Sequence, residues 1–187
     1  RQLGPFRSAA TAVARVLSRL PMPVSLVDMG GGIGVSYAGE PELDCAELAR
    51  IMAREFAPWP SARLLIEPGR YLVADAGFLL TRVLYNKKTS KRCFVIVDAA
   101  MNDLARPALY GAVHPVAPAR SRQGRRRTVD VVGPVCESGD FLARQRVLPP
   151  VERGYVLVVR MAGAYGFAMS SQYNSRPRAA EILVADG

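Results

Sequence analysis

Two stretches in the first half of the chain carry apolar residues at helical spacing. Between Phe6 and Leu20 the apolar positions are Ala9, Ala10, Val13, Val16, Leu17 and Leu20. In PELDCAELARIMAREF, residues 41–56, they are Leu43, Leu48, Ile51, Met52 and Phe56. Apolar residues three and four positions apart share one face of a helix. We therefore predict an amphipathic helix in each stretch, the first ended by Pro21 and Pro23.

Short apolar runs flank the second of these helices. Residues 24–29 lead into a glycine-rich turn, and ARLLIEPGR, residues 62–70, is a second apolar run that ends in a turn. The order strand, loop, helix, strand is typical of a parallel α/β sheet or barrel, whose functional groups gather at the carboxyl ends of the strands. We expect the loops after these two strands to lie side by side.

The pattern changes to strands after Gly77. The segment 78–101 predicts two strands joined by a polar turn, and three further strands are predicted at RTVDVVG (127–133), GYVLVVRMAGAY (154–165) and AAEILVAD (179–186). We place a boundary near residues 76–79. The sequence thus predicts an α/β domain over residues 1–77 and a β-rich domain over residues 78–187.

Composition favours a globular protein of a reducing compartment. Half of the 187 residues are apolar, enough for a substantial core. The three cysteines, Cys45, Cys93 and Cys136, are widely spaced and form no CxxC pair, so neither a disulfide framework nor a structural zinc site is indicated. No apolar run approaches the roughly 20 residues of a membrane span, and the first residues lack the core of a signal peptide. We expect a cytoplasmic protein without a membrane partner.

The net charge of +9 raises the question of nucleic-acid binding. Much of the excess lies in RSRQGRRR, which holds Arg120, Arg122, Arg125, Arg126 and Arg127. No aromatic residue is interleaved there for base stacking, so we expect a solvated loop and no nucleic-acid partner. The positive balance still raises the local concentration of a small anionic ligand.

Polar groups follow both strands of the first domain. In GGGIG, Gly30, Gly31, Gly32 and Gly34 let backbone N–H groups approach an anion, although a plain tight turn is as good an interpretation of this loop alone. In EPGR, Glu67 is a carboxylate at a strand end, Pro68 and Gly69 turn the chain, and Arg70 offers a fork of donors. Together the two loops predict an anion cradle beside a carboxylate.

A third polar cluster lies in VVGPVCESGDFL, residues 131–142. Apolar strand residues give way to a thiol, a carboxylate, a hydroxyl, a glycine and a second carboxylate. This arrangement suits a functional site on a loop. A hairpin tip with a buried cysteine is the alternative that the segment by itself leaves open.

Five segments in order resemble the diaminopimelate decarboxylase family, bacterial-type enzymes that use pyridoxal 5′-phosphate (PLP). They are LVDMGGGIGVSY, IEPGRYLVADAG, VDAAMNDLARPALYGAVHPV, VVGPVCESGDFL and MAGAYGFAMSSQYNSRPRAAEILV. CESGD and RPALY are more specific than the glycine loop and EPGR, which related ornithine and arginine decarboxylases share. The resemblance implies the end of a PLP-binding (β/α)8 barrel followed by a β-rich carboxyl-terminal domain.

The resemblance also implies a role for each polar cluster. The cofactor would be held by Gly30, Gly31, Gly32, Glu67, Pro68, Gly69, Arg70 and Tyr165. The substrate would be held by Arg70, Arg106, Tyr110, Glu137 and Tyr165. Glu67 would face the pyridine nitrogen of PLP, and Cys136 would be the catalytic acid that protonates the carbon from which CO2 departs. The family is homodimeric, and its pattern implies active sites shared between subunits.

One ingredient of the family is missing from this chain. Such enzymes bind PLP covalently through a lysine, yet Lys87, Lys88 and Lys91 are the only lysines and lie together in a polar turn. We therefore expect a carboxyl-terminal portion of the enzyme, inactive by itself. Two alternatives remain: a decarboxylase of ornithine, arginine or a carrier-bound amino acid, or a non-catalytic PLP-binding fragment. His114 and Trp59 are interpreted as packing residues.

Overall fold

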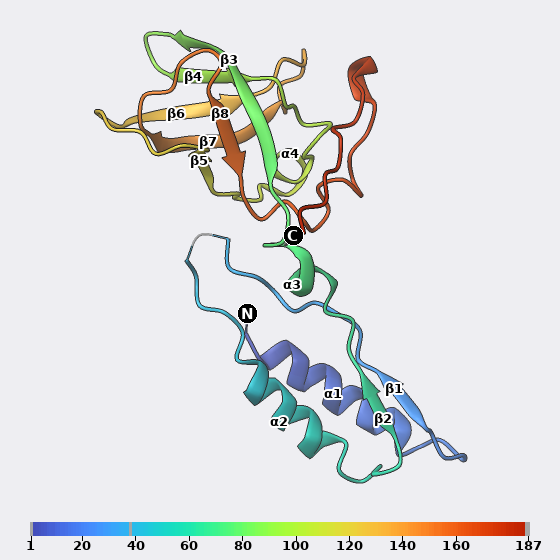
Figure 1. Cartoon of the computed structure of the whole chain (residues 1–187). Helices are drawn as coiled ribbons and strands as arrows, with labels where there is room; N and C mark the ends of the chain where they lie inside the picture. The colour runs from blue at the N-terminus through green and yellow to red at the C-terminus, as the bar shows by residue number, and fades with distance from the viewer. Residues whose placement is uncertain (1, 38, 186–187) are drawn as a thin grey trace. The chain divides into compact units, whose positions relative to one another are not determined.

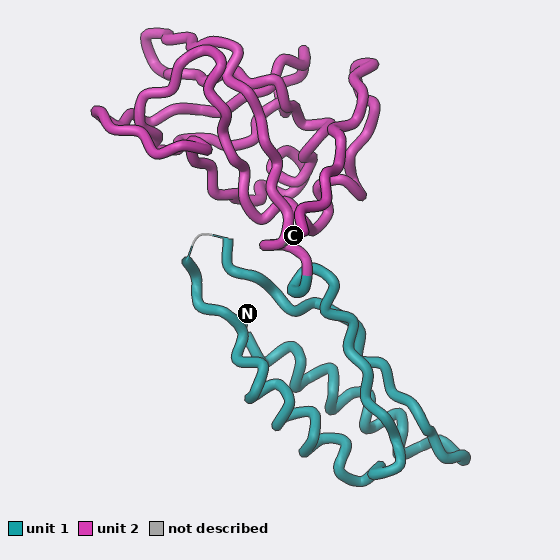
Figure 2. Tube along the Cα trace, in the orientation of Figure 1, with its two compact units in different colours: residues 1–72 teal, residues 73–187 magenta. Residues whose placement is uncertain are grey.

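The computed structural model describes residues 2–37 and 39–185 of the chain (Figure 1). The chain divides into two compact units, residues 1–72 and residues 73–187 (Figure 2). This division falls a few residues before the boundary expected from the sequence.

The first unit alternates helices and strands. Its elements are α1 (Gly4–Leu17), β1 (Leu26–Asp28), α2 (Cys45–Glu55) and β2 (Arg63–Leu65), and α3 (Gly69–Val73) runs across the division. β1 and β2 pair in parallel, with Val27 opposite Leu64, so the predicted order of strand, loop, helix and strand is confirmed. α1 ends before the predicted Leu20, and α3 stands where the sequence indicated only a turn.

The core of the first unit lies between the two long helices and the strands. Ala10 and Leu17 of α1 pack with Leu48 and Met52 of α2 and with Val27 of β1. The Asp44 side chain accepts a hydrogen bond from the backbone N–H of Glu47 at 2.9 Å, which caps the start of α2. The Trp59 ring packs against this core, in agreement with its predicted packing role. It meets the Phe56 ring edge to face, with 6.5 Å between the ring centres.

The second unit is built on a curved sheet. Among its described residues, six strands lie in the order β5-β8-β3-β4-β6-β7. They are β3 (Leu79–Lys88), β4 (Cys93–Val97), β5 (Val116–Pro118), β6 (Arg127–Val132), β7 (Phe141–Leu148) and β8 (Val156–Val159). The pairs are antiparallel except β4 with β6, and the outer strands β5 and β7 also contact one another, so the sheet curls toward a barrel (Figure 1). A helix, α4 (Arg106–Tyr110), and a 3-10 turn (Tyr173–Ser175) complete the unit.

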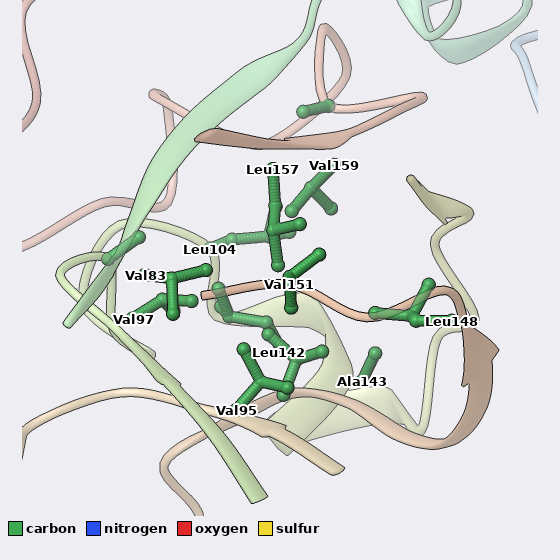
Figure 3. Close-up of a cluster of buried hydrophobic side chains, with 13 residues drawn as sticks. Val83, Val95, Val97, Leu104, Leu142, Ala143, Leu148, Val151, Leu157 and Val159 are labelled. Atoms are coloured by element: carbon green, nitrogen blue, oxygen red, sulfur yellow. The ribbon is translucent and has the colours of Figure 1, made fainter. Parts of the chain in front are cut away.

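Inward-facing side chains of the strands fill the centre of this sheet (Figure 3). Leu157 and Val159 alternate with half-buried neighbours along β8, as expected for a strand with one face on the core. They meet Val83 of β3, Leu142 of β7 and Leu104, all fully buried.

The prediction of a strand over residues 179–186 is wrong for the residues that the structure describes. Residues 179–185 form no strand, and Ile182, Leu183 and Val184 are 84%, 93% and 86% exposed. Their β-branched and aliphatic side chains favour an extended chain, but a strand also needs a neighbour with which to exchange backbone hydrogen bonds. Asp186 lies outside the described residues. Across the described part of the chain, each helix is too short or too polar to cross a bilayer.

Replacing Leu157 by alanine tests the central position of this side chain. The leucine is fully buried in the core of the second unit, so Leu157→Ala should lower the free energy of unfolding by about 2–5 kcal/mol. Leu80→Ala, at a neighbouring strand position that is 63% exposed, should change it by less than about 1 kcal/mol. Urea unfolding followed by circular dichroism measures both, and equal losses would contradict the assignment of the core.

Candidate functional site

The glycine loop and the EPGR turn lie in contact, as their places after neighbouring strands predict. The N–H of Glu67 donates to the carbonyl of Gly30 at 2.8 Å. Gly31 approaches Glu67 so closely that a Cβ on Gly31 would lie 2.4 Å from the Glu67 carbonyl oxygen. Gly32, with φ of +91°, adopts a backbone conformation that suits glycine. The first unit therefore brings the predicted cradle and carboxylate together.

The residues of this cradle fit a bound phosphate. Around Gly32 and Gly69, a Cβ would meet nothing within 4 Å, so both backbones border open space. The Nε atom of Arg70 is buried and has no hydrogen-bond partner within the described part of the chain. A buried donor without an acceptor is costly, and an anion at this position would satisfy it. Glu67 is exposed, which leaves its carboxylate accessible to a ligand.

In the second unit, Arg106 contacts two aromatic rings. Its side chain is only 8% exposed, and its guanidinium carbon is 5.0 Å from the centre of the Tyr165 ring and 5.8 Å from that of Tyr110. Both distances suit a cation–π contact. Tyr110 ends α4, one turn after Arg106, which accounts for their meeting. Three of the predicted substrate-binding residues are thus gathered at one place.

Tyr165 is held there by a close backbone contact. The residue has φ of +66°, which is unusual for a side chain of this size. Nearby, a Cβ on Gly163 would lie 1.9 Å from the carbonyl oxygen of Val73, and the N–H of Ala162 donates to the carbonyl of Gly77 at 2.9 Å. The turn after β8 is therefore fixed against residues 73–77, and the glycine makes this approach possible.

The CESGD loop connects the antiparallel strands β6 and β7 and presents its thiol outward. Cys136 is exposed, so the alternative of a buried cysteine at a hairpin tip is wrong. Glu137 is also exposed, and both of its carboxylate oxygens accept hydrogen bonds. The N–H of Gly139 donates to Oε1 at 3.4 Å, and the hydroxyl of Tyr173 donates to Oε2 at 3.3 Å.

The second carboxylate of the motif, Asp140, has a structural role. It is 6% exposed, and its two oxygens accept hydrogen bonds from the N–H groups of Met101 at 2.8 Å and Val135 at 2.7 Å. Gly133 packs so tightly on it that a Cβ there would lie 2.5 Å from Oδ2. Burial raises the pKa of the Asp140 carboxyl, and the two backbone hydrogen bonds oppose that shift. Asp140 closes the loop that carries Cys136.

A short segment, residues 98–104, connects the parts of this region. Met101 binds Asp140, as described above, and the adjacent Asn102 is 2% exposed. The Nδ2 of Asn102 donates to the carbonyl of Ser171 at 3.2 Å, and the N–H of Ser171 donates back to the Asn102 carbonyl at 2.9 Å. Sequence reasoning missed Asn102, Asp140 and Tyr173 as site residues. The sequence offered no clear signal for Asn102, which is followed by Asp103, whereas Asp140 ends the polar run of CESGD.

The CESGD loop also lies on α4. A Cβ on Gly139 would be in ordinary contact, at 3.8 Å, with the side chains of Ala108 and Met101. Since α4 begins at Arg106, this packing places the thiol-bearing loop beside the helix that carries the buried arginine. The two motifs with the most specific family resemblance, CESGD and RPALY, are therefore neighbours in the second unit.

His114 is a buried packing residue, as predicted. It is fully buried, and its Nδ1 lies 3.0 Å from the carbonyl oxygen of Arg160. Burial lowers the pKa of His114, and the positive charge of Arg106 acts in the same direction.

The lysines and the arginine-rich segment lie at the surface, as expected. Lys87, Lys88 and Lys91 are exposed around the turn between β3 and β4. The arginine-rich segment 120–127 is exposed as well, and the Arg122 guanidinium lies 3.9 Å from the centre of the Tyr155 ring.

Comparison with known proteins identifies the family. Residues 24–163 match the C-terminal sheet domain of the pyridoxal-dependent decarboxylases. The chain belongs to this family.

Within this family, the chain is similar to diaminopimelate decarboxylases from several organisms. Over 98% of its length the chain is 49% identical to the diaminopimelate decarboxylase of Pseudomonas aeruginosa, and over 99% it is 40% identical to that of Aquifex aeolicus. The crystal structure of diaminopimelate decarboxylase from Helicobacter pylori complexed with L-lysine matches 95% of the chain with a TM-score of 0.88 and 40% identity. The chain spans 44%, 45% and 44% of these three proteins, less than half of each.

Replacing Asp140 by asparagine tests its role in closing the loop. The amide nitrogen of Asp140→Asn would face a backbone N–H and leave it buried without an acceptor, so the free energy of unfolding should fall by about 1–3 kcal/mol. Asp75→Asn, at an exposed position of the same unit, is the control and should have little effect. Chemical denaturation of both variants measures the difference.

The same variant should show a defined pH dependence. Burial raises the folded-state pKa of Asp140 above its ordinary value of 3.8. Stability contributed by such a group is fully present below the unfolded-state pKa and declines as pH rises through the folded-state pKa. The advantage of the parent over Asp140→Asn should therefore narrow as the pH is raised from the ordinary carboxyl pKa of 3.8 through the higher folded-state pKa. An advantage that grows with pH would show that Asp140 is more acidic in the folded state than in the unfolded one.

Proposed function

We propose that this chain forms part of a PLP-dependent diaminopimelate decarboxylase, which converts meso-2,6-diaminopimelate to L-lysine and CO2. The observation that carries the proposal is the Arg106 side chain, in contact with the rings of Tyr110 and Tyr165 and with the CESGD loop packed on its helix. The similarity to diaminopimelate decarboxylases extends across nearly the whole chain, which supports this substrate over ornithine or arginine.

The first unit would be the last part of a (β/α)8 barrel. The parallel pairing of β1 with β2 around an intervening helix supports this arrangement. In such a barrel the ligand lies at the carboxyl ends of the strands, where the glycine loop and Glu67 lie in this unit. The curved sheet of the second unit would then complete the active site and take part in a homodimer.

The cradle of the first unit would hold the cofactor. Gly30, Gly31, Gly32 and Gly69 would line the phosphate site of PLP, with the turn at Pro68 between the two loops. The N–H groups of Gly31 and Gly32 and the Arg70 side chain would donate to the phosphate, because the N–H groups of Gly30 and Gly69 already donate to Asp28 and to the Glu67 carbonyl. Tyr165 would add a hydroxyl to this phosphate. Glu67 would keep a proton on the pyridine nitrogen, and the protonated ring, when bound, accepts the electron pair left by departing CO2.

The charged side chains would grip a substrate that is long and carries charges at both ends. Arg70 and Arg106 can each pair with a carboxylate through two parallel hydrogen bonds, and Glu137 can pair with the distal ammonium. Tyr110 and Tyr165 would enclose the chain between these ends and exclude water from the Arg106 pair, which strengthens it. Cys136 would then deliver its proton to the carbon that has lost CO2.

The active site would be shared between two subunits. Cys136 and Glu137 are exposed on a loop of the second unit, which suits residues that are lent to a partner. Because a two-fold axis makes the exchange reciprocal, each subunit would give this pair and receive the same pair in return.

Replacing Glu137 by glutamine tests the substrate assignment in the complete enzyme. Glu137→Gln removes a charge-assisted contact to the distal ammonium, worth about 1.5–3 kcal/mol, so kcat/KM for diaminopimelate should fall about ten- to a hundredfold. The visible absorbance of bound PLP should be unchanged. Glu152→Gln, at an exposed glutamate of the same unit, serves as the control. Parental kinetics in Glu137→Gln would remove the support for this substrate.

Subunit complementation tests the shared site. One inactive variant of the complete enzyme lacks the upstream lysine that holds PLP, and the other carries Cys136→Ala. After equal amounts are unfolded, mixed and refolded, each mixed dimer would hold one intact site and one doubly damaged site, which restores roughly a quarter of parental activity. If mass spectrometry finds mixed dimers while activity stays at the level of the unmixed variants, each site is built within one subunit.

A further inference from the structure

We propose that Tyr173 is a positioning residue of this site, which orients the Glu137 carboxylate for the distal ammonium of the substrate. The inference rests on the proposed function and adds to it a residue that sets specificity through Glu137. It follows from the hydrogen bonds of Glu137 and from the way in which the turn around Tyr173 is anchored.

The Glu137 carboxylate is held from two directions. The Tyr173 hydroxyl donates to Oε2 at 3.3 Å, and the N–H of Gly139 donates to Oε1 at 3.4 Å. Both donor–acceptor distances lie slightly beyond the usual range, so each hydrogen bond is weak by itself. An exposed glutamate without such contacts would sample several rotamers, and fixing them on binding costs free energy. The two contacts together reduce that cost before the substrate arrives.

These contacts leave the carboxylate able to bind an ammonium. An ionised carboxylate offers about four acceptor positions. The Tyr173 hydroxyl and the Gly139 N–H occupy one on each oxygen, so further lone pairs remain for the substrate. A tyrosine hydroxyl is also neutral, and it orients the carboxylate without cancelling the charge that attracts the ammonium.

The turn that carries Tyr173 is anchored on both sides. Before it, Ser171 exchanges two hydrogen bonds with the buried Asn102, at 2.9 and 3.2 Å. After it, the Nε of Arg176 donates to the Asn102 side-chain oxygen at 3.2 Å. A single buried amide therefore fixes both ends of the segment that presents Tyr173.

The backbone of this turn is strained. Asn174 and Ser175 have φ of +62° and +58°, two consecutive left-handed residues that are not glycine. Such conformations persist when surrounding contacts impose them, and they gather at functional sites. The anchoring by Asn102 supplies these contacts.

Two adjacent residues hold the two loops that carry Glu137 and Tyr173, the partners of the hydrogen bond at 3.3 Å. Met101 binds the Asp140 carboxylate, which closes the loop of Glu137, and Asn102 holds the turn of Tyr173. Neighbouring positions in one segment thus set the distance between the carboxylate and the hydroxyl. The contact is built into the second unit.

A matched pair of inhibitors isolates the effect on the distal ammonium. L-lysine keeps the ammonium and carboxylate of the distal end of the substrate, and 6-aminohexanoate differs from it only by lacking that ammonium. In the complete enzyme with PLP, Tyr173→Phe should raise the inhibition constant of L-lysine about three- to tenfold and leave that of 6-aminohexanoate unchanged. KM for diaminopimelate should rise by a similar factor, with kcat changed less than twofold.

Two further variants complete the experiment. Tyr85→Phe, at a tyrosine of similar exposure on β3, is the matched control and should leave both inhibition constants at parental values. If Tyr173 acts through Glu137, adding Tyr173→Phe to Glu137→Gln should cause no further loss. The ratio of the inhibition constants of L-lysine and 6-aminohexanoate does not depend on the fraction of enzyme that folds. A variant that folds only in part therefore still tests the positioning role of Tyr173.

The outcomes separate this inference from the proposed function. Equal weakening of both inhibitors by Tyr173→Phe, or no weakening of either, overturns the positioning role while the decarboxylase assignment stands. Full additivity with Glu137→Gln overturns it as well. A complete parental enzyme that neither decarboxylates diaminopimelate nor binds L-lysine overturns the proposed function, and this inference falls with it.

Discussion

The arrangement of the second unit depends on one buried carboxylate. Asp140 joins the N–H groups of Met101 and Val135, two positions that are far apart in the chain. A carboxylate out of contact with water is costly unless it is fully hydrogen-bonded, so these donors must come to it for the loop to close. These two hydrogen bonds, together with the packing of Gly139 on Ala108, place the loop of Cys136 and Glu137 beside α4.

Two glycines hold other parts of the candidate site together, because they let two main chains come into direct contact. Gly31 against Glu67 in the first unit, and Gly163 against Val73 in the second, allow main chains to meet at distances that any Cβ would prevent. In each case the contact lies beside a polar residue of the candidate site. The glycines of these motifs thus act through shape, whether or not they also donate to a ligand.

The sequence predicted the elements whose periodicity is strong and missed those that tertiary contacts create. α1, α2, the β3–β4 pair, β6 and β8 follow from apolar spacing. Short elements such as α4 and β5 have too few residues to show a period, and the eight-residue β7 was missed because its buried and exposed positions do not alternate. The exposed segment 182–184 shows that an apolar run without a strand partner stays irregular.

The candidate site was predicted to a similar extent. The cradle of the first unit and the cluster of Arg106, Tyr110 and Tyr165 gather as the motifs suggested. The sequence did not predict that Asn102 and Asp140 hold the site together. A buried polar residue is recognised by its hydrogen-bond partners, and here these partners come from distant segments of the chain.

The strand order of the second unit has a consequence for how the site comes into existence during folding. β6 and β7 are neighbours in both sequence and space, so the loop that carries Cys136 closes over a short length of chain. β3, by contrast, pairs with β8, and this pairing encloses every strand between them. Long closures are entropically costly and slow. The turn of Tyr165 follows β8, so we expect its contact with Arg106 to form later in folding than the thiol loop between β6 and β7.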